Sequence, residues 1–130
     1  MEIGKQDDVL DQGVLSPLRK AKPELFRRLV RTYLAYAPKA LSELNRAAAA
    51  NDCEALGAVA HSLKSSSANL GAPVLSSYCR TLERIAGERR IGDTLGLVAQ
   101  INAHFGLVQS GLERELAAID ASAPPGKAAM

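Results

Sequence analysis

Aromatic residues are scarce in this chain, whose 130 residues include three Tyr, two Phe and no Trp. Sheets favour aromatic and β-branched side chains, so a composition rich in Ala and Leu argues against a β-sandwich. An excess of one charge is missing as well, because 16 Lys and Arg are interspersed with 14 Asp and Glu. No broad electrostatic field therefore favours a nucleic acid or an anionic membrane. The composition indicates a single helical domain.

Segments typical of export, membrane insertion or disulfide frameworks are also lacking. Residues 1–8 are polar and do not resemble a signal peptide. The uncharged run 94–112 has about the length of a membrane span, but polar side chains inside it indicate a mostly buried helix of a soluble protein. Cys53 and Cys79 have no metal-binding spacing, and we interpret both as small core residues. We expect a cytoplasmic protein.

Apolar side chains recur every three or four residues in four segments, which predicts four amphipathic helices. The first spans residues 23–50 and begins with a proline, whereas Pro38 in its interior predicts a kink or a break. Asn51 or Asp52 can cap the first turn of the second helix. Gly71 is expected to end that helix.

Pro73 is expected to start the third helix and Gly87 to end it. Asp93 is expected to cap the fourth helix, which runs from Thr94 to about Ile119. The first helix is expected to bury Phe26, Leu29, Val30, Tyr33, Ala37, Ala40, Leu41, Leu44 and Ala48. The second is expected to bury Leu56, Val59, Ala60, Leu63, Ser67 and Leu70, and the third Leu75, Tyr78, Cys79, Leu82, Ile85 and Ala86. The fourth is expected to bury Leu95, Val98, Phe105, Val108, Leu112, Leu116 and Ile119.

Short connections between long helices favour antiparallel neighbours, so we predict an all-α, up-down-up-down four-helix bundle over residues 22–119. Residues 1–21 form an N-terminal lead-in, in which residues 7–20 are expected to add a short helix across one end. Residues 120–130 are rich in Pro and Gly and are predicted to form a flexible tail.

An exposed histidine lies in the second predicted helix. When its apolar stripe faces the core, the solvent side carries Gly57, Ala58, His61, Lys64, Ser65 and Ala68. Lys64 then lies one turn from His61, within reach of a group bonded to the imidazole. A histidine that lies beside one ammonium and is otherwise surrounded by small side chains is a candidate for carrying a covalently bound group. Most surface histidines, however, are merely solvated. His104, which has no lysine partner, is interpreted as structural.

The run from Ala60 to Ala72, AHSLKSSSANLGA, resembles the central motif of histidine-containing phosphotransfer domains, the HPt family of two-component phosphorelays. The pattern of Cys79, Leu82 and Glu83 is similar to that of the family's following helix. The Ala-Pro step of the preceding helix and the Asn-Asp loop before the motif also resemble the family. The resemblance covers about residues 22–119.

This resemblance implies a four-helix bundle in which His61 accepts a phosphoryl group from a receiver-domain aspartate and passes it to another receiver. Lys64 would neutralise the phosphoryl oxygens, Ser65 stands where the family more usually has Gly, and Glu83 stands where it has Glu or Gln. The implied partners are response-regulator receiver domains and a hybrid sensor histidine kinase, and the sequence is compatible with either a free-standing protein or one domain of a membrane-bound hybrid kinase. The expected partner-binding residues are Gly57, Ala58, Ser65, Ala68, Glu83 and Arg84, and the expected structural ones are Asp52 and Gly71.

Two motifs that phosphoryl-transfer enzymes need are missing from the sequence. It contains no Gly-rich phosphate loop or Walker-type motif for ATP, and no acidic cluster that would hold Mg²⁺. We therefore expect a phosphoryl carrier rather than an enzyme, with no cofactor of its own. The Mg²⁺ would be supplied at the partner receiver.

Three other functions are less consistent with the sequence. A docking module without phosphorylation would need neither His61 nor Lys64. A metal-binding bundle is disfavoured because neither histidine has a glutamate three residues before it. Nucleic-acid binding is disfavoured because the arginines are interleaved with glutamates and have no aromatic platform. These arginines are Arg27, Arg28, Arg31, Arg84, Arg89 and Arg90. We expect a monomer that does not insert into membranes.

Overall fold

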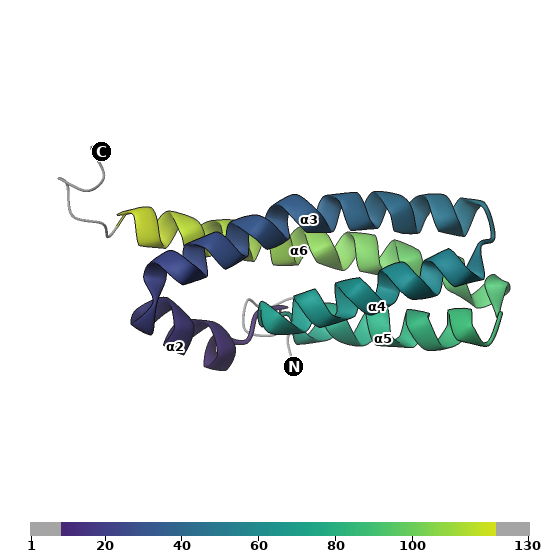
Figure 1. The fold of residues 1–130 in the computed structure, drawn as a ribbon, viewed down its shortest axis with the longest axis horizontal. Helices are drawn as coiled ribbons and strands as arrows, with labels where there is room; N and C mark the ends of the chain where they lie inside the picture. The colour runs from purple at the N-terminus through teal and green to yellow at the C-terminus, as the bar shows by residue number, and fades with distance from the viewer. Residues whose placement is uncertain (1–8, 122–130) are drawn as a thin grey trace.

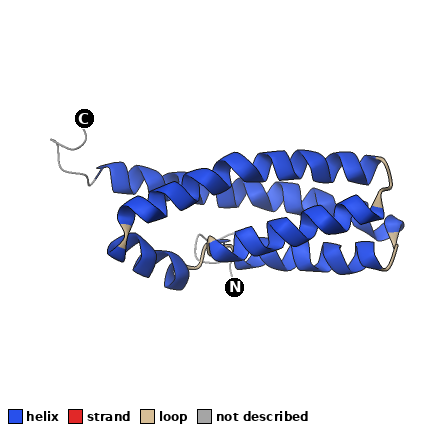
Figure 2. Cartoon of the chain, viewed as in Figure 1, coloured by secondary structure: helices blue, strands red, loops and turns tan. Residues whose placement is uncertain are grey.

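The computed structural model of the chain describes residues 9–121. In that range the secondary structure is entirely helical, and short loops join the helices (Figure 2). The elements are α2 (Gln12–Ala21), α3 (Pro23–Ala49), α4 (Cys53–Asn69), α5 (Pro73–Gly87), the 3₁₀ turn η1 (Ile91–Asp93) and α6 (Thr94–Ala121).

Four long helices form the body of the protein. Helix α3 packs against α4 and α6, and α5 packs against the same two helices, so the four follow one another around the core in chain order. Short loops at the two ends reverse the chain between successive helices (Figure 1). The predicted all-α, up-down-up-down bundle is confirmed.

The core is built from one apolar stripe on each long helix, and its fully buried side chains include Phe26, Leu56, Leu82 and Leu112. Two predicted core positions are wrong, because Leu29 is 38% exposed and Leu95 is 59% exposed. Leu29 directly precedes the buried Val30 and is therefore turned about 100° away from it around the helix axis. At the start of α6, the buried Thr94 faces the core in place of Leu95. Ile101, which the predicted stripe omits, is also fully buried.

Helix α3 is continuous through Pro38, so the predicted alternative of a break is wrong. Pro38 lies on the exposed side of the helix, where its ring faces solvent. Ala37, Ala40 and Leu41 continue the buried stripe on both sides of the proline. Burial of this stripe against the rest of the bundle stabilises the helix where one backbone hydrogen bond is lost.

The loops around α4 are determined by particular residues. The carboxylate of Asp52 accepts a hydrogen bond from the backbone N–H of Ala55 at 3.0 Å, so Asp52 caps the helix and not Asn51. Asn51 instead adopts a left-handed conformation at the end of α3. Gly71 is also left-handed, with φ at 69°, and a Cβ there would lie 3.2 Å from the carbonyl oxygen of Asp11.

Helix α2 lies across one end of the bundle, as predicted for residues 7–20 (Figure 1). Its Leu15 is completely buried, and Arg19 forms a partly buried ion pair with Glu115 near the end of α6. The backbone N–H of Asp11 donates to the carbonyl of Gly71 at 2.7 Å. The lead-in is thus an integral part of the domain where the structure describes it.

Helix α6 begins differently from the prediction. Asp93 belongs to the 3₁₀ turn, and its carboxylate pairs with Arg90 at 2.7 Å instead of capping the helix. The helix continues to Ala121, past the predicted end at 119, and the remainder of the predicted tail lies outside the described residues. Within residues 9–121, none of the helices combines the length and apolarity of a membrane span.

Candidate functional site

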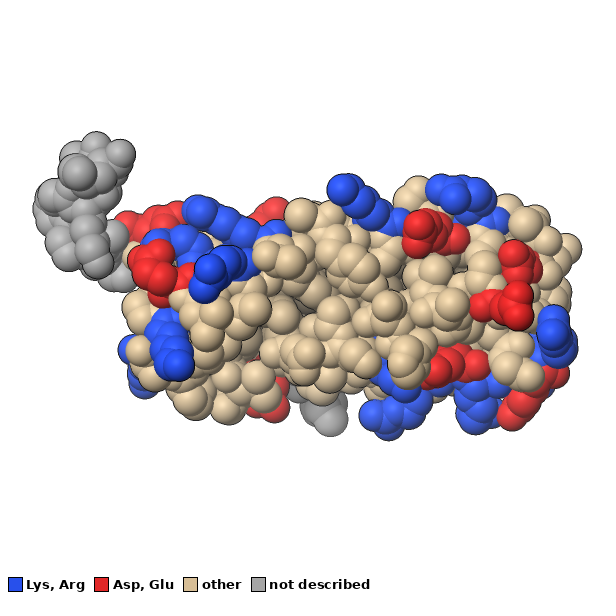
Figure 3. All heavy atoms as spheres, viewed as in Figure 1, with Lys and Arg blue, Asp and Glu red and all other residues tan. Residues whose placement is uncertain are grey.

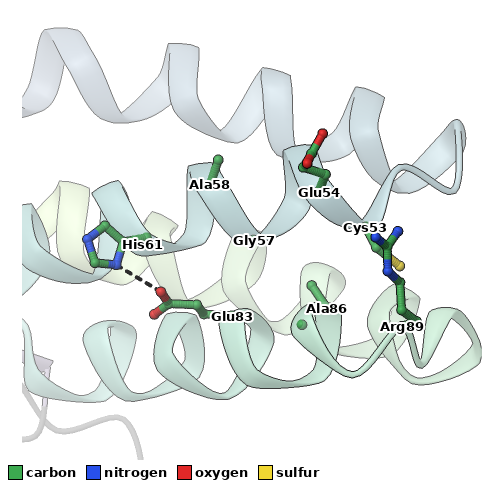
Figure 4. A pocket seen from close by; sticks show the side chains of 9 residues that line it. Cys53, Glu54, Gly57, Ala58, His61, Glu83, Ala86 and Arg89 are labelled. Atoms are coloured by element: carbon green, nitrogen blue, oxygen red, sulfur yellow. Dashed lines mark hydrogen bonds and ion pairs between the residues drawn. The ribbon is translucent and has the colours of Figure 1, made fainter.

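His61 stands on the exposed side of α4, and its side chain is 64% exposed. Helix α5 runs alongside and brings Glu83 close to it, although 22 positions separate the two in the sequence. The Nδ1 atom of His61 and the Oε2 atom of Glu83 lie 2.8 Å apart (Figure 4). The imidazole is therefore held at one nitrogen and open to solvent elsewhere.

The same carboxylate holds Lys64. Its Nζ atom donates a hydrogen bond to Oε1 of Glu83 at 2.7 Å, so the two carboxylate oxygens bridge a lysine and a histidine. The hydrogen bond from Lys64, and to a smaller extent the one to His61, lowers the pKa of Glu83 below its ordinary value. Glu83 is thus an ionised carboxylate at neutral pH.

This ionisation determines which nitrogen of His61 is available. A carboxylate only accepts hydrogen bonds, so the Nδ1 atom of His61 carries the proton and donates it to Glu83. The other nitrogen, Nε2, points away from Glu83 (Figure 4). In the neutral ring this Nε2 atom keeps its lone pair and faces solvent as a nucleophile.

Hydroxyl groups tie the site to the rest of the bundle. Ser76 on α5 donates to the backbone carbonyl of Lys64 at 2.9 Å. Tyr33 on α3 and the buried Ser67 share a hydrogen bond of 2.8 Å, and burial raises the pKa of Tyr33 to about 12. Both neighbours of α4 therefore fix the segment that carries the histidine.

A groove between α4 and α5 extends from His61 to the end of the bundle. We call it the His61 groove, and it is lined by Cys53, Glu54, Gly57, Ala58, His61, Glu83, Ala86, Gly87 and Arg89. A Cβ added at Gly57 would lie 3.8 Å from that of Ala86, which is an ordinary van der Waals contact. Helix packing does not require glycine there, so its smallness keeps the floor of the groove open.

The comparisons with known proteins agree with this geometry. The model of the Hpt domain family matches residues 28–122. The chain belongs to the Hpt family. Its structure is similar to the crystal structure of histidine-containing phosphotransfer protein B (HptB) from Pseudomonas aeruginosa PAO1, with a TM-score of 0.79 and 31% sequence identity. That match covers 82% of this chain and 93% of HptB. A search of the curated proteins found no match.

Hpt proteins are phosphocarriers rather than kinases, and they act in phosphorelays with receiver domains and histidine kinases. This chain therefore takes part in histidine phosphotransfer.

The structure separates the predicted partner-binding residues into three places. Gly57, Ala58 and Glu83 line the His61 groove. Ser65 and Ala68 are exposed on α4 beyond His61, on the other side from the groove. Arg84 is exposed on α5 but does not line the groove, and its guanidinium lies 3.6 Å from Glu88.

Charge is unevenly distributed around the site of this Hpt domain. Residues 65–79 contain no charged side chain, and on the face seen in Figure 3 an uncharged band separates groups of charged side chains toward the two ends. Several arginines that were considered for nucleic-acid binding are paired within the chain. Arg27 pairs with Glu24 and Asp120, and Arg90 pairs with Glu88 and Asp93.

The other histidine and the cysteines have different surroundings. His104 is half-buried on α6 and packs edge-on against the ring of Tyr78, with the ring centroids 5.6 Å apart. Cys53 and Cys79 are buried free thiols, and burial raises the pKa of Cys79 to about 12. Among the residues that the structure describes, no group of three or more His, Cys, Asp or Glu could hold a metal ion.

Proposed function

We propose that this Hpt domain accepts a phosphoryl group on Nε2 of His61 from the aspartyl phosphate of one receiver domain and passes it to the aspartate of another. The observation that carries the proposal is the hydrogen bond between Nδ1 of His61 and the carboxylate of Glu83. With the proton on Nδ1, the nitrogen that can carry a lone pair is Nε2, which faces outward as an attacking nitrogen must.

The transfer is an in-line displacement at phosphorus. The Nε2 lone pair forms the N–P bond while the bond from phosphorus to the aspartyl oxygen breaks, and the aspartate leaves as a carboxylate. The proton on Nδ1 stays in its hydrogen bond with Glu83. The phosphorylated ring is then cationic, and the carboxylate beside it stabilises that charge. Reversal of the same displacement delivers the phosphoryl group to the second receiver.

Lys64 would supply the positive charge for the phosphoryl oxygens. Its ammonium is held by Glu83, one helical turn from His61, on a long side chain that is 26% exposed. When a phosphoryl group arrives at Nε2, rotation about that side chain can bring the ammonium from Glu83 toward the new negative charge. Glu83 thus keeps Lys64 near the reacting atoms.

The His61 groove and the small residues beside His61 would receive the receiver domain. Gly57 and Ala58 leave room on one side of the imidazole, and Ser65 and Ala68 do so on the other. Arg84 would contact the receiver beyond the groove. The Mg²⁺ that such transfers commonly use would come with the receiver.

The test is transfer of radiolabelled phosphate from receiver domains loaded with labelled acetyl phosphate in the presence of Mg²⁺. The wild type and His104→Gln should acquire acid-labile, alkali-stable label, and His61→Gln should acquire none. Glutamine is uncharged and still polar, so binding of the receiver should survive in His61→Gln.

Two results would contradict the proposal. Label on His61→Gln would place the phosphoryl group on another residue. Binding of receivers without any label on the wild type would instead make the chain a docking module, the alternative weighed from the sequence.

A further inference from the structure

Arg89 has an unusual backbone conformation for its residue type. Its φ is 61°, and the backbone N–H groups of Arg89 and Arg90 donate to the carbonyls of Ala86 and Ile85 at the end of α5. In this type of helix end the left-handed position is most often glycine, because a Cβ is disfavoured there. The arginine is therefore unfavourable for the local fold.

Arg89 also differs from its arginine neighbours in its contacts. Arg84 and Arg90 both pair with Glu88, and Arg90 pairs with Asp93 as well. Arg89 is exposed and forms no ion pair with any residue that the structure describes, although Glu54 lines the same groove. Its charge is available to a partner.

The position of Arg89 places this charge at the rim of the docking surface. Arg89 lines the His61 groove at the end that also contains Cys53, on the first turn of α4 (Figure 4). Cys53 precedes His61 by eight residues, which corresponds to about 12 Å along the helix. A charge at that distance acts on the docked partner rather than on the phosphoryl group.

We propose that Arg89 is a specificity-determining residue whose guanidinium binds a carboxylate on the receiver domain that docks over the His61 groove. The inference rests on the proposed function, since it concerns the same docking surface. On the other side of His61, residues 65–79 are uncharged, whereas the groove end carries Glu54 and Arg89, so charge at this end can help to distinguish one receiver from another. Exposed charge pairs of this kind mainly accelerate association and weaken with added salt.

The experiment measures phosphoryl transfer from labelled receiver domains at low and at saturating receiver concentration. For the receivers that transfer fastest to the wild type, Arg89→Gly should slow transfer about two- to fivefold at low salt and low concentration. At saturating concentration the rate should equal that of the wild type. The variant should melt at the same or a higher temperature, because glycine suits the left-handed backbone.

Two further variants separate charge from other effects. Arg89→Lys should keep most of the rate, and Arg28→Ala, which removes the same charge from α3, should transfer like the wild type. Equal rates for Arg89→Gly and the wild type at low concentration would overturn the inference. So would an equal slowing at saturating concentration, which would mean that Arg89 acts on the chemical step. No label on the wild type would overturn the proposed function itself, and the inference with it.

Discussion

The two histidines of this Hpt domain have the same side chain in opposite surroundings. His61 is 64% exposed, and its Nδ1 atom is held by the carboxylate of Glu83. His104 is half-buried, packs edge-on against Tyr78, and its buried Nε2 atom has no hydrogen-bond partner among the described residues. Burial lowers the pKa of His104. Of the two rings, only His61 presents a nitrogen to a partner.

The difference shows that the neighbouring helix sets the orientation of the exposed imidazole. An exposed imidazole alone has no fixed tautomer, and a buried one cannot reach a receiver. Glu83 on α5 fixes the ring of His61 from one side, and small residues leave the other side open. The charges around His61 and the burial of His104 should therefore respond differently to substitution.

The largest effect is expected from Lys64→Ala. The variant removes the ammonium that donates to Glu83 beside His61. A single charge or hydrogen-bond donor that faces the negative charge of a transition state commonly accelerates a reaction many-fold. We therefore expect the single-turnover rate of phosphoryl transfer to fall by about tenfold or more. Lys39→Ala removes the same charge from the exposed side of α3 and should leave the rate unchanged. A Lys64→Ala rate within twofold of the wild type would mean that the receiver supplies all the neutralising charge.

A smaller effect is expected from Glu83→Gln. The amide oxygen can still accept the hydrogen bond from Nδ1 of His61, but the negative charge that would stabilise a phosphorylated ring is lost. A hydrogen bond to a charged group is about twice as strong as one between neutral groups. We therefore expect the rate of transfer to fall by roughly three- to tenfold. Rapid-quench measurements on the wild type, Glu83→Gln and Glu113→Gln would check this. A rate for Glu83→Gln equal to that of Glu113→Gln would show that the carboxylate charge is not needed.

The smallest effect is expected from His104→Phe and concerns stability. The pKa of His104 lies below its ordinary 6.5 in the folded protein. Well above pH 6.5, His104 is unprotonated in both the folded and the unfolded protein. At lower pH the unfolded chain binds a proton on His104 more readily than the folded protein does, so the free energy of unfolding falls. Phenylalanine keeps the edge contact with Tyr78 and removes this titration. Urea unfolding should therefore favour His104→Phe over the wild type more at pH 5 than at pH 8, and phosphoryl transfer should be unchanged. A stability difference that does not vary with pH would contradict this interpretation.

Much of the fold could be predicted because the helical periodicity is local information. The apolar spacing gave four helices and the short loops gave their antiparallel order. The errors at Pro38 and Leu95 occur where tertiary packing decides: burial on both sides carries α3 through the proline, and Thr94 takes the core position that was assigned to Leu95. Neither outcome can be inferred from spacing alone.

The site was only partly predictable for the same reason. His61 and Lys64 share one helix face, so their proximity follows from a spacing of three residues. Glu83 belongs to the next helix, and its bridge to both side chains depends on the alignment of α4 against α5. Arg89 appeared in the sequence only as one of several arginines. Its place in the groove follows from the backbone at the end of α5.

The central claim is that Nε2 of His61 carries the phosphoryl group while Glu83 holds Nδ1. NMR of protein with ¹⁵N-labelled histidine, recorded before and after phosphorylation by a receiver domain, tests it most directly. We predict that the phosphorus couples to Nε2 of His61, that Nδ1 keeps its proton, and that the signals of His104 do not change. Phosphorus coupled to Nδ1 of His61, or to either nitrogen of His104, would contradict the account.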